Sequence, residues 1–275
     1  MQPLDIGVML GVGENPRESL KKVRDLGVPT AQMGCPPQKY LAGEGRAELK
    51  RMIDESVVEI TTVFCGFSGE SYADIPTVRR TVGLVPKNTR AERVEKTKAI
   101  VDFANDIDVA NVAAHIGFIY DDPADPDYPE LVKVVQGICD YCAKNGQNFC
   151  LETGQEKAEV LLRFINHVNR PNLKVNFDPA NMILYGSGEP IAALKLLGGY
   201  VAGVHCKDGT WPTEENLLGH EEPLGKGQVG IDRFIATLKE IGYEGPLTIE
   251  REIGGEQQVA DIKAAIELLD SLKGK

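Results

Sequence analysis

Short apolar runs alternate with amphipathic helical stretches along the chain, and this alternation constrains its fold more than any other feature. Strands that alternate with helices predict a parallel sheet connected by helical crossovers. The strand candidates are residues 5–10, 30–35, 58–67, 109–117, 148–154, 173–181, 201–209 and 246–253. The helical candidates include residues 16–27, 46–56, 90–106, 129–146, 156–168, 231–242 and 256–272.

Eight strands with about as many helices favour a closed (β/α)8 TIM barrel over an open doubly wound sheet. The 275 residues suit a barrel, which typically needs roughly 250. A dinucleotide-binding sheet would need a G-x-G-x-x-G turn after its first strand, and residues 11–20 do not provide one. We therefore predict an α/β protein with a single (β/α)8 barrel domain over residues 1–275.

Two connections are longer than a barrel requires, and both follow strand candidates. They cover residues 68–88, after the third strand, and residues 210–230, after the seventh. Loops that follow barrel strands build the active-site face. We expect both connections at the mouth of the barrel.

Composition excludes several classes of protein. A net charge of -11 with scattered Lys and Arg disfavours nucleic-acid binding. No apolar run approaches the roughly 18 residues of a membrane span, and the first residues lack a basic signal-peptide region, so we expect a cytoplasmic protein without membrane contact.

Cys65, Cys150 and Cys206 lie in apolar runs and predict buried thiols. Cys139 and Cys142 have the C-x-x-C spacing of zinc and redox sites, but they lie in a helical pattern and no second pair of Cys or His ligands is nearby in the sequence.

Polar residues at the ends of four successive strand candidates carry the chemistry. They are Glu152, Asp178, His205 and Glu250. In a barrel, residues at these strand ends point into the mouth, so neighbouring strands would bring all four together. Three clustered carboxylates repel one another unless a cation neutralises them. We predict a divalent metal site, with Mn²⁺ or Mg²⁺ preferred for three oxygen donors and one imidazole, and Co²⁺ or Zn²⁺ as alternatives.

Other polar residues near the same strand ends are candidates for contact with a substrate. These are His115, Gln155, Glu156, Asn181, Lys207 and Trp211. Structural roles stay open for His115, for Glu156 as a charge at a helix N-terminus, and for Trp211 as a packing residue. Asp208 either orients His205 or occupies a turn. Lys226, in a Gly-rich segment, is the one feature that suggests a phosphorylated substrate.

The four strand ends, the segments LETGQE, NFDPANM and VHCKDG, and the run over residues 223–252 resemble the xylose isomerase-like barrel family of sugar and sugar-phosphate isomerases and epimerases. The resemblance covers essentially the whole chain. It implies that Glu152, Asp178, His205 and Glu250 are metal ligands. In the related ketose 3-epimerases, the residues that correspond to Glu152 and Glu250 also form the acid-base pair.

The chain departs from those epimerases at three positions. Ala158, Asn181 and Trp211 stand where they usually carry Glu, His and Arg. We therefore expect a metal-dependent sugar or sugar-phosphate isomerase or epimerase, with an inosose or 3-keto-sugar dehydratase as the alternative. A non-catalytic sugar-binding barrel and an abasic-site endonuclease are weaker alternatives. The expected partner is a small sugar or polyol, and a homo-oligomer is compatible with the sequence.

Overall fold

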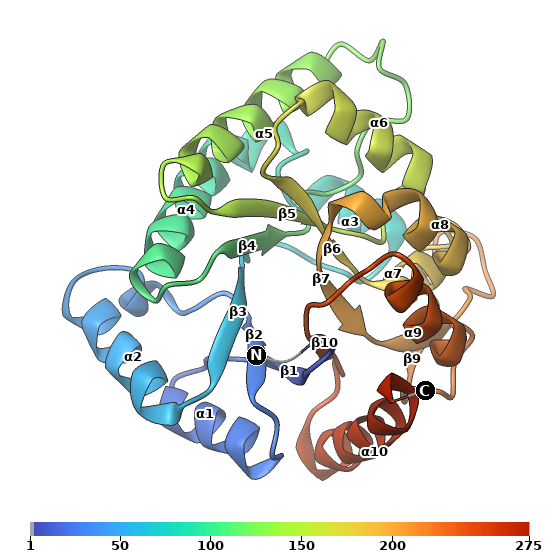
Figure 1. Ribbon diagram of the computed structural model, residues 1–275. Helices are drawn as coiled ribbons and strands as arrows, with labels where there is room; N and C mark the ends of the chain where they lie inside the picture. The colour runs from blue at the N-terminus through green and yellow to red at the C-terminus, as the bar shows by residue number, and fades with distance from the viewer. Residues whose placement is uncertain (1–2, 275) are drawn as a thin grey trace.

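Eight parallel strands close into a barrel in the computed structural model, which describes residues 3–274 (Figure 1). The hydrogen-bonded order around the barrel is β1-β10-β7-β6-β5-β4-β3-β2. The barrel strands are β1 (Ile6–Leu10), β2 (Thr30–Met33), β3 (Glu59–Phe64), β4 (Asn111–Ala114), β5 (Asn148–Glu152), β6 (Leu173–Phe177), β7 (Val201–Cys206) and β10 (Leu247–Ile249). Each lies within a predicted strand, so the predicted TIM barrel is confirmed.

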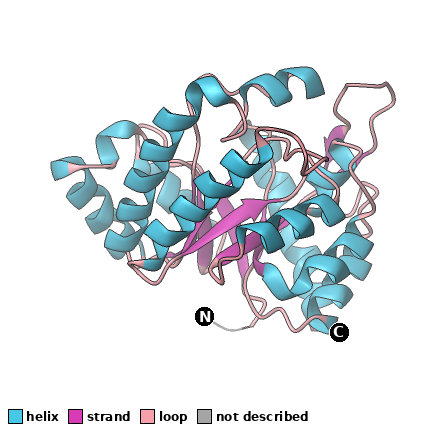
Figure 2. Cartoon of the chain, turned by 90° about the horizontal axis from the view of Figure 1, so that it is seen from above, coloured by secondary structure: helices cyan, strands magenta, loops and turns pink. Residues whose placement is uncertain are grey.

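Helices surround the barrel, and Figure 2 shows them on both sides of the strands. They are α1 (Pro16–Asp25), α2 (Gly43–Ser56), α3 (Ile75–Thr81), α4 (Lys87–Asp106), α5 (Tyr128–Ala143), α6 (Ala158–Val168), α7 (Pro179–Leu184), α8 (Pro190–Leu197), α9 (Ile231–Glu240) and α10 (Gly255–Lys273), with single 3-10 turns at Gln38–Tyr40 and Gly198–Tyr200. The described helices include none that is both long and apolar enough to cross a membrane.

The hydrophobic core has two parts. A large cluster fills the space between strands and helices, and a small one inside the barrel contains Phe64, Ala113 and Cys150. Cys150 and Cys206 are buried as predicted, whereas Cys65 is half-buried. Cys139 and Cys142 are buried in α5 within the large cluster. The helical pattern therefore explains their spacing without a metal.

Both long connections carry structure that was not predicted. The first contains α3, and the second contains a two-stranded antiparallel hairpin of β8 (Asp208–Thr210) and β9 (His220–Glu222). Tyr72 from the first connection and Leu218 from the second line the central cavity at the end of the barrel where the strands finish. This confirms that the two connections build the mouth.

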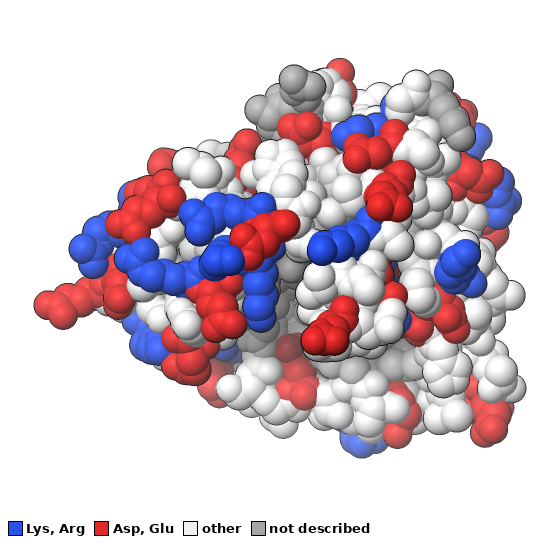
Figure 3. All heavy atoms as spheres, turned by 90° about the horizontal axis from the view of Figure 1, so that it is seen from below, with Lys and Arg blue, Asp and Glu red and all other residues white. Residues whose placement is uncertain are grey.

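Charges of both signs are interspersed on the face shown in Figure 3. Lys and Arg side chains lie beside Asp and Glu side chains, and the positive charge on this face is not gathered into a stripe. A basic stripe is the usual electrostatic footprint of a nucleic-acid-binding surface. The face in view does not present one.

Candidate metal centre

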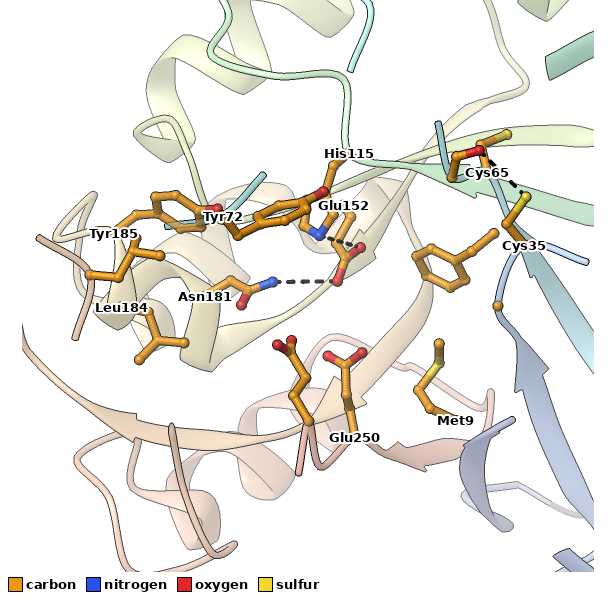
Figure 4. Close-up of a pocket in the computed structure, with 15 residues that line it drawn as sticks. Met9, Cys35, Cys65, Tyr72, His115, Glu152, Asn181, Leu184, Tyr185 and Glu250 are labelled. Atoms are coloured by element: carbon orange, nitrogen blue, oxygen red, sulfur yellow. Dashed lines mark hydrogen bonds and ion pairs between the residues drawn. The ribbon is translucent and has the colours of Figure 1, made fainter. Parts of the chain in front are cut away.

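The four predicted ligands meet beside the central cavity, which Glu152 and Glu250 line. Their ligand atoms, from Glu152, Asp178, His205 and Glu250, all lie within 4.8 Å of one another. His205 Nδ1 is 3.0 Å from Glu152 Oε1, 3.5 Å from Asp178 Oδ2 and 3.2 Å from Glu250 Oε2. Figure 4 shows Glu152 and Glu250 reaching toward the site from opposite sides. Consecutive strands β5, β6 and β7 and the neighbouring β10 thus bring together residues that are far apart in the sequence.

The charges in this cluster balance one another only in part. Burial favours the neutral form of Glu152, but His115 and His205 outweigh burial and bring its pKa to about 2. Burial lowers the pKa of His205, but the carboxylates of Glu250 and Glu152 outweigh it and hold this pKa well above its ordinary value. Without a metal, the His205 imidazolium is the cation nearest to all three carboxylates, and Lys207 and His115 add positive charge beside Glu250 and Glu152. A divalent ion would replace its Nδ1 proton, so metal binding should release a proton.

Two buried atoms in the cluster have no hydrogen-bond partner among residues 3–274. They are His205 Nδ1, despite its closeness to the carboxylates, and Asp178 Oδ2. The other carboxylate oxygen, Asp178 Oδ1, accepts a hydrogen bond from the backbone N–H of Asn181 at 2.9 Å and so caps α7. Buried polar atoms in native proteins are almost always paired. The donor set and these two free atoms fit a divalent metal held by all four residues.

The far side of the His205 ring is held by a residue that the sequence interpretation missed. His205 Nε2 lies 2.9 Å from Gln32 Oε1, and Gln32 Nε2 donates to Asn176 Oδ1 at 3.1 Å. This chain of amides places the proton on Nε2 and leaves Nδ1 as the ligand. Gly203 leaves space for the Asn176 side chain, because a Cβ on Gly203 would lie 2.5 Å from Asn176 Oδ1. The amide side chain of Gln32 between two apolar residues of a strand candidate was the available signal.

Gln32→Met is expected to lower metal affinity by about 10–100-fold, since outer hydrogen-bond partners of metal-bound histidines typically have effects of this size. Gln147→Met is the matched control, because Gln147 is also a buried amide but donates to the carbonyls of Val101 and Val109. Calorimetric titration with Mn²⁺ measures both variants. Equal affinities for the two would remove Gln32 from its assigned role.

His115, Gln155 and Asn181 lie where the sequence predicts. His115 Nε2 is 2.9 Å from Glu152 Oε2, and Gln155 Nε2 is 3.1 Å from His115 Nδ1. Asn181 Nδ2 donates to Glu152 Oε1 at 3.4 Å. Burial disfavours protonation of His115, but the Glu152 carboxylate raises its pKa to about 9. His115 and Asn181 line the cavity, and Gln155 stands behind His115.

Lys207 is buried beside the ligands, where it is only 1% exposed. Its ammonium donates to Glu250 Oε2 at 3.0 Å and to Asn181 Oδ1 at 3.2 Å, and it forms a close ion pair with Glu252. Glu252 lines the cavity and was not among the predicted residues. Lys207 therefore holds the Glu250 carboxylate in place from behind the cavity wall.

Asp208 does not orient His205, so that expectation is wrong. Its carboxylate accepts hydrogen bonds from the backbone N–H groups of Gly209, Gly225, Gly227 and Val229 at 2.9, 2.9, 3.0 and 3.1 Å. A Cβ on Gly227 would lie 2.2 Å from Asp208 Oδ1, so this close approach needs glycine. The amides around Lys226 that suggested phosphate binding are thus already paired with a carboxylate of the same chain.

Trp211 and Glu156 lie outside the lining of the central cavity. Trp211 follows the last residue of β8 and begins the loop that leads to β9. Its backbone N–H donates to Gln228 Oε1 at 3.0 Å. Leu218 of the same connection lines the cavity instead of Trp211. Contact between Trp211 and a substrate therefore stays a prediction, which the lining of the central cavity does not support.

The central cavity has a volume of about 350 Å³. Its lining also includes aromatic, aliphatic and thiol side chains that the sequence interpretation did not assign to the site, namely Met9, Cys35, Phe64, Cys65, Tyr72, Leu184, Tyr185 and Leu218 (Figure 4). Phe64 stacks on the His205 ring with centroids 5.3 Å apart. An apolar wall around a few polar groups is the usual form of a small-molecule site.

Comparison with known proteins agrees with this architecture. A crystal structure of a xylose isomerase domain protein from Planctomyces limnophilus superposes with a TM-score of 0.94 at 46% identity, covering 98% of both chains. An uncharacterized protein of Methanocaldococcus jannaschii is 24% identical over 87% of this chain and 80% of its own. An L-ribulose 3-epimerase of a Methylomonas species is 30% identical over 43% of this chain and 40% of its own.

A family model covers most of the chain. The model of the xylose isomerase-like TIM barrel matches residues 20–272. This range includes the four ligand positions and the barrel strands from β2 to β10. The chain therefore belongs to the xylose isomerase-like TIM barrel family.

Proposed function

We propose that this protein is a divalent-metal-dependent isomerase or epimerase that removes an α-proton from a keto-sugar or polyol. The observation that carries the proposal is the convergence of Glu152, Asp178, His205 and Glu250 beside a cavity about 350 Å³ in volume. Membership of the family and the partial likeness to an L-ribulose 3-epimerase support this class of reaction.

A bound divalent cation would supply Lewis-acid stabilisation of the negative charge that develops on a substrate carbonyl oxygen. The residues of the chain handle the proton. Glu152 and Glu250 face each other across the site, so epimerisation would use one of them as the carboxylate that accepts the α-proton and the other, entering the step as the protonated acid, as the donor to the opposite face of the same carbon. Positioned bases of this kind contribute roughly 10²–10⁴ in rate. Epimerisation is the outcome of this geometry.

The surrounding residues hold the two carboxylates in place. His115 and Asn181 bind the two oxygens of Glu152, and Lys207 binds Glu250. Glu152 and Glu250 therefore each have one fixed orientation before a substrate enters. Preorganisation of this kind lowers the barrier because little reorganisation is left for the reaction itself.

A dehydratase that acts on an inosose or 3-keto-sugar is the second candidate. It would use the same α-proton removal and then expel a β-hydroxyl, which needs a proton donor at the cavity wall. His115 lines the cavity, and its Nε2 is 2.9 Å from Glu152 Oε2, so a proton donor stands beside the base.

Return of the proton to the neighbouring carbon would instead give aldose-ketose isomerisation.

The test combines metal analysis with proton exchange. We expect about one equivalent of Mn²⁺, Mg²⁺ or a similar ion per chain. We also expect exchange of an α-proton in deuterated water for one member of a panel of ketoses, inososes and 3-keto-sugars. A chelator should abolish the exchange, and added metal should restore it. No metal after reconstitution, together with no exchange, would favour a non-catalytic sugar-binding protein.

A further inference from the structure

A second cavity lies next to the catalytic one. This side chamber, about 180 Å³ in volume, is defined here by Arg79, Phe118, Gln155, Glu156 and Tyr185, which are among the residues that line it. Tyr185 lines both cavities. Figure 4 shows Tyr185 and Tyr72 together at the end of the central cavity away from Cys35. The Tyr185 side chain is therefore a wall common to both cavities.

Glu156 is the buried polar group of the side chamber. The residue is 7% exposed, and its Oε2 has no hydrogen-bond partner among residues 3–274. An unpaired buried polar atom costs about 1–3 kcal/mol, so its presence calls for an explanation. Burial raises the pKa of Glu156 to about 8, so at neutral pH the carboxyl group can both donate and accept a hydrogen bond.

The other walls of the side chamber suit an uncharged, hydroxylated ligand. Phe118 and Tyr185 pack edge to face with centroids 5.8 Å apart, and the Arg79 guanidinium lies 4.0 Å from the centre of the Phe118 ring. Arg79 and Lys157 at the chamber carry positive charge, and Asp121 carries negative charge. Asp121 offsets one of these two positive charges, and the Arg79 guanidinium is held against the Phe118 ring, so a phosphorylated probe is needed to test whether the remaining positive charge attracts an anion.

The position of Tyr185 between the cavities is set by the backbone. Gly154 follows β5 with a φ of +152°, and a Cβ there would lie 2.7 Å from Asn181 Cβ and 3.3 Å from Tyr185 Cδ2. Gln155, the next residue, donates from Nε2 toward His115 Nδ1 at 3.1 Å. One short segment, residues 152–156, therefore supplies a metal ligand, the partner of His115 and the carboxyl group of the side chamber.

We propose that the side chamber is a second binding subsite, which takes an uncharged hydroxyl-bearing unit attached to the keto-sugar. The substrate is then larger than a monosaccharide: a keto-sugar that carries a glycosyl or similar polyol substituent. The ring that reacts lies over the metal centre, and the substituent passes Tyr185 to reach Glu156. This inference rests on the proposed function for the reacting ring, but its binding step can be measured separately.

The test compares ligands of two sizes in the metal-loaded protein. The probes are a 3-keto-monosaccharide, the 3-keto-disaccharide that carries the same reacting ring, and the 6-phosphate of the monosaccharide. We expect the disaccharide to bind at least about tenfold more tightly than the monosaccharide by calorimetry, with a matching gain in kcat/KM for proton exchange. Tenfold corresponds to about 1.4 kcal/mol, the size of one buried hydrogen bond.

Variants of Glu156 test whether its carboxyl group causes the tighter binding of the disaccharide. Glu156→Leu should remove most of the disaccharide advantage, whereas Glu156→Gln, which keeps a donor and an acceptor, should restore it. Glu159→Leu is the matched control, because Glu159 is an exposed carboxylate in the first turn of α6 outside the side chamber. This control should keep the wild-type ratio of disaccharide to monosaccharide affinity.

Three results would overturn the subsite: equal affinity for both sugars, an advantage that Glu156→Leu leaves intact, or preferred binding of the phosphate. Any of them can occur while metal-dependent exchange of the monosaccharide persists, and the proposed function would then stand. Tighter disaccharide binding without exchange of any sugar would instead overturn the proposed reaction and support the subsite.

Discussion

Turnover is expected to fall by at least about 10²–10⁴-fold in both Glu152→Gln and Glu250→Gln, since each change removes a carboxylate positioned for proton transfer. Each also removes a metal ligand, so occupancy should fall as well, and activity should be measured at saturating Mn²⁺. The fold should survive because Gln has nearly the same shape and the neighbouring hydrogen bonds can re-form. Circular dichroism and thermal unfolding check this second expectation.

The matched control for these variants is Glu59→Gln. Glu59 begins β3 at the opposite end of the barrel and is exposed, so its substitution should leave turnover unchanged. Substantial residual activity in Glu152→Gln or Glu250→Gln would remove that residue from the proton-transfer pair. Loss of activity in only one of the two would assign a single base and favour dehydration or isomerisation over epimerisation.

The largest effect on stability is expected from Asp208→Ala. The carboxylate is buried and accepts four backbone hydrogen bonds from Gly209 and the 225–229 segment. Removing it leaves four amide donors without their acceptor, and we expect a loss of about 3–5 kcal/mol in the free energy of unfolding. The free energy of unfolding of Asp208→Asn should lie between those of the wild type and Asp208→Ala, because the Asn side chain keeps one acceptor oxygen but has no charge.

Urea unfolding measures this loss, and hydrogen exchange locates it. The amides of Gly225, Gly227 and Val229 should exchange faster in Asp208→Ala than in the wild type. Asp232→Ala is the control, since Asp232 is an exposed residue in the first turn of α9 and its loss should cost less than about 1 kcal/mol. An unchanged urea midpoint in Asp208→Ala would show that the segment does not depend on this carboxylate.

The barrel and the clustering of the four predicted ligands could be predicted from the sequence because both follow from local patterns. Apolar runs mark the strands, and a polar residue at the end of such a run points into the mouth. Asp178 illustrates this, since it directly follows β6 and both caps α7 and faces His205. The short helices α7 and α8, each beginning at a proline, were missed because they lack room for a helical periodicity.

The errors concern residues whose partners are distant in the sequence. For Asp208 the sequence left two roles open, orientation of His205 or a place in a turn, and its partners lie in the 225–229 segment that the β8–β9 hairpin returns to it. Gln32 was missed because only the closed barrel brings β2 near His205. Glu156 lies near Glu152 in the sequence but lines the side chamber and not the central cavity, so its predicted contact with a substrate stays a prediction of a different kind of contact. Spacing alone does not contain this information.

The strand order has a consequence for assembly during synthesis. Three ligands come from adjacent strands β5, β6 and β7, but Glu250 follows β10, which pairs with β7 on one side and β1 on the other. The strand made last therefore completes both the ligand set and the seam of the barrel. Chains begin to fold from the N-terminus while they are being made. Until β10 is synthesised, the facing edges of β1 and β7 therefore have no strand to pair with. The strand that carries the last of the predicted ligands is thus also the one that covers the exposed sheet edge, and until it pairs that edge is open to aggregation.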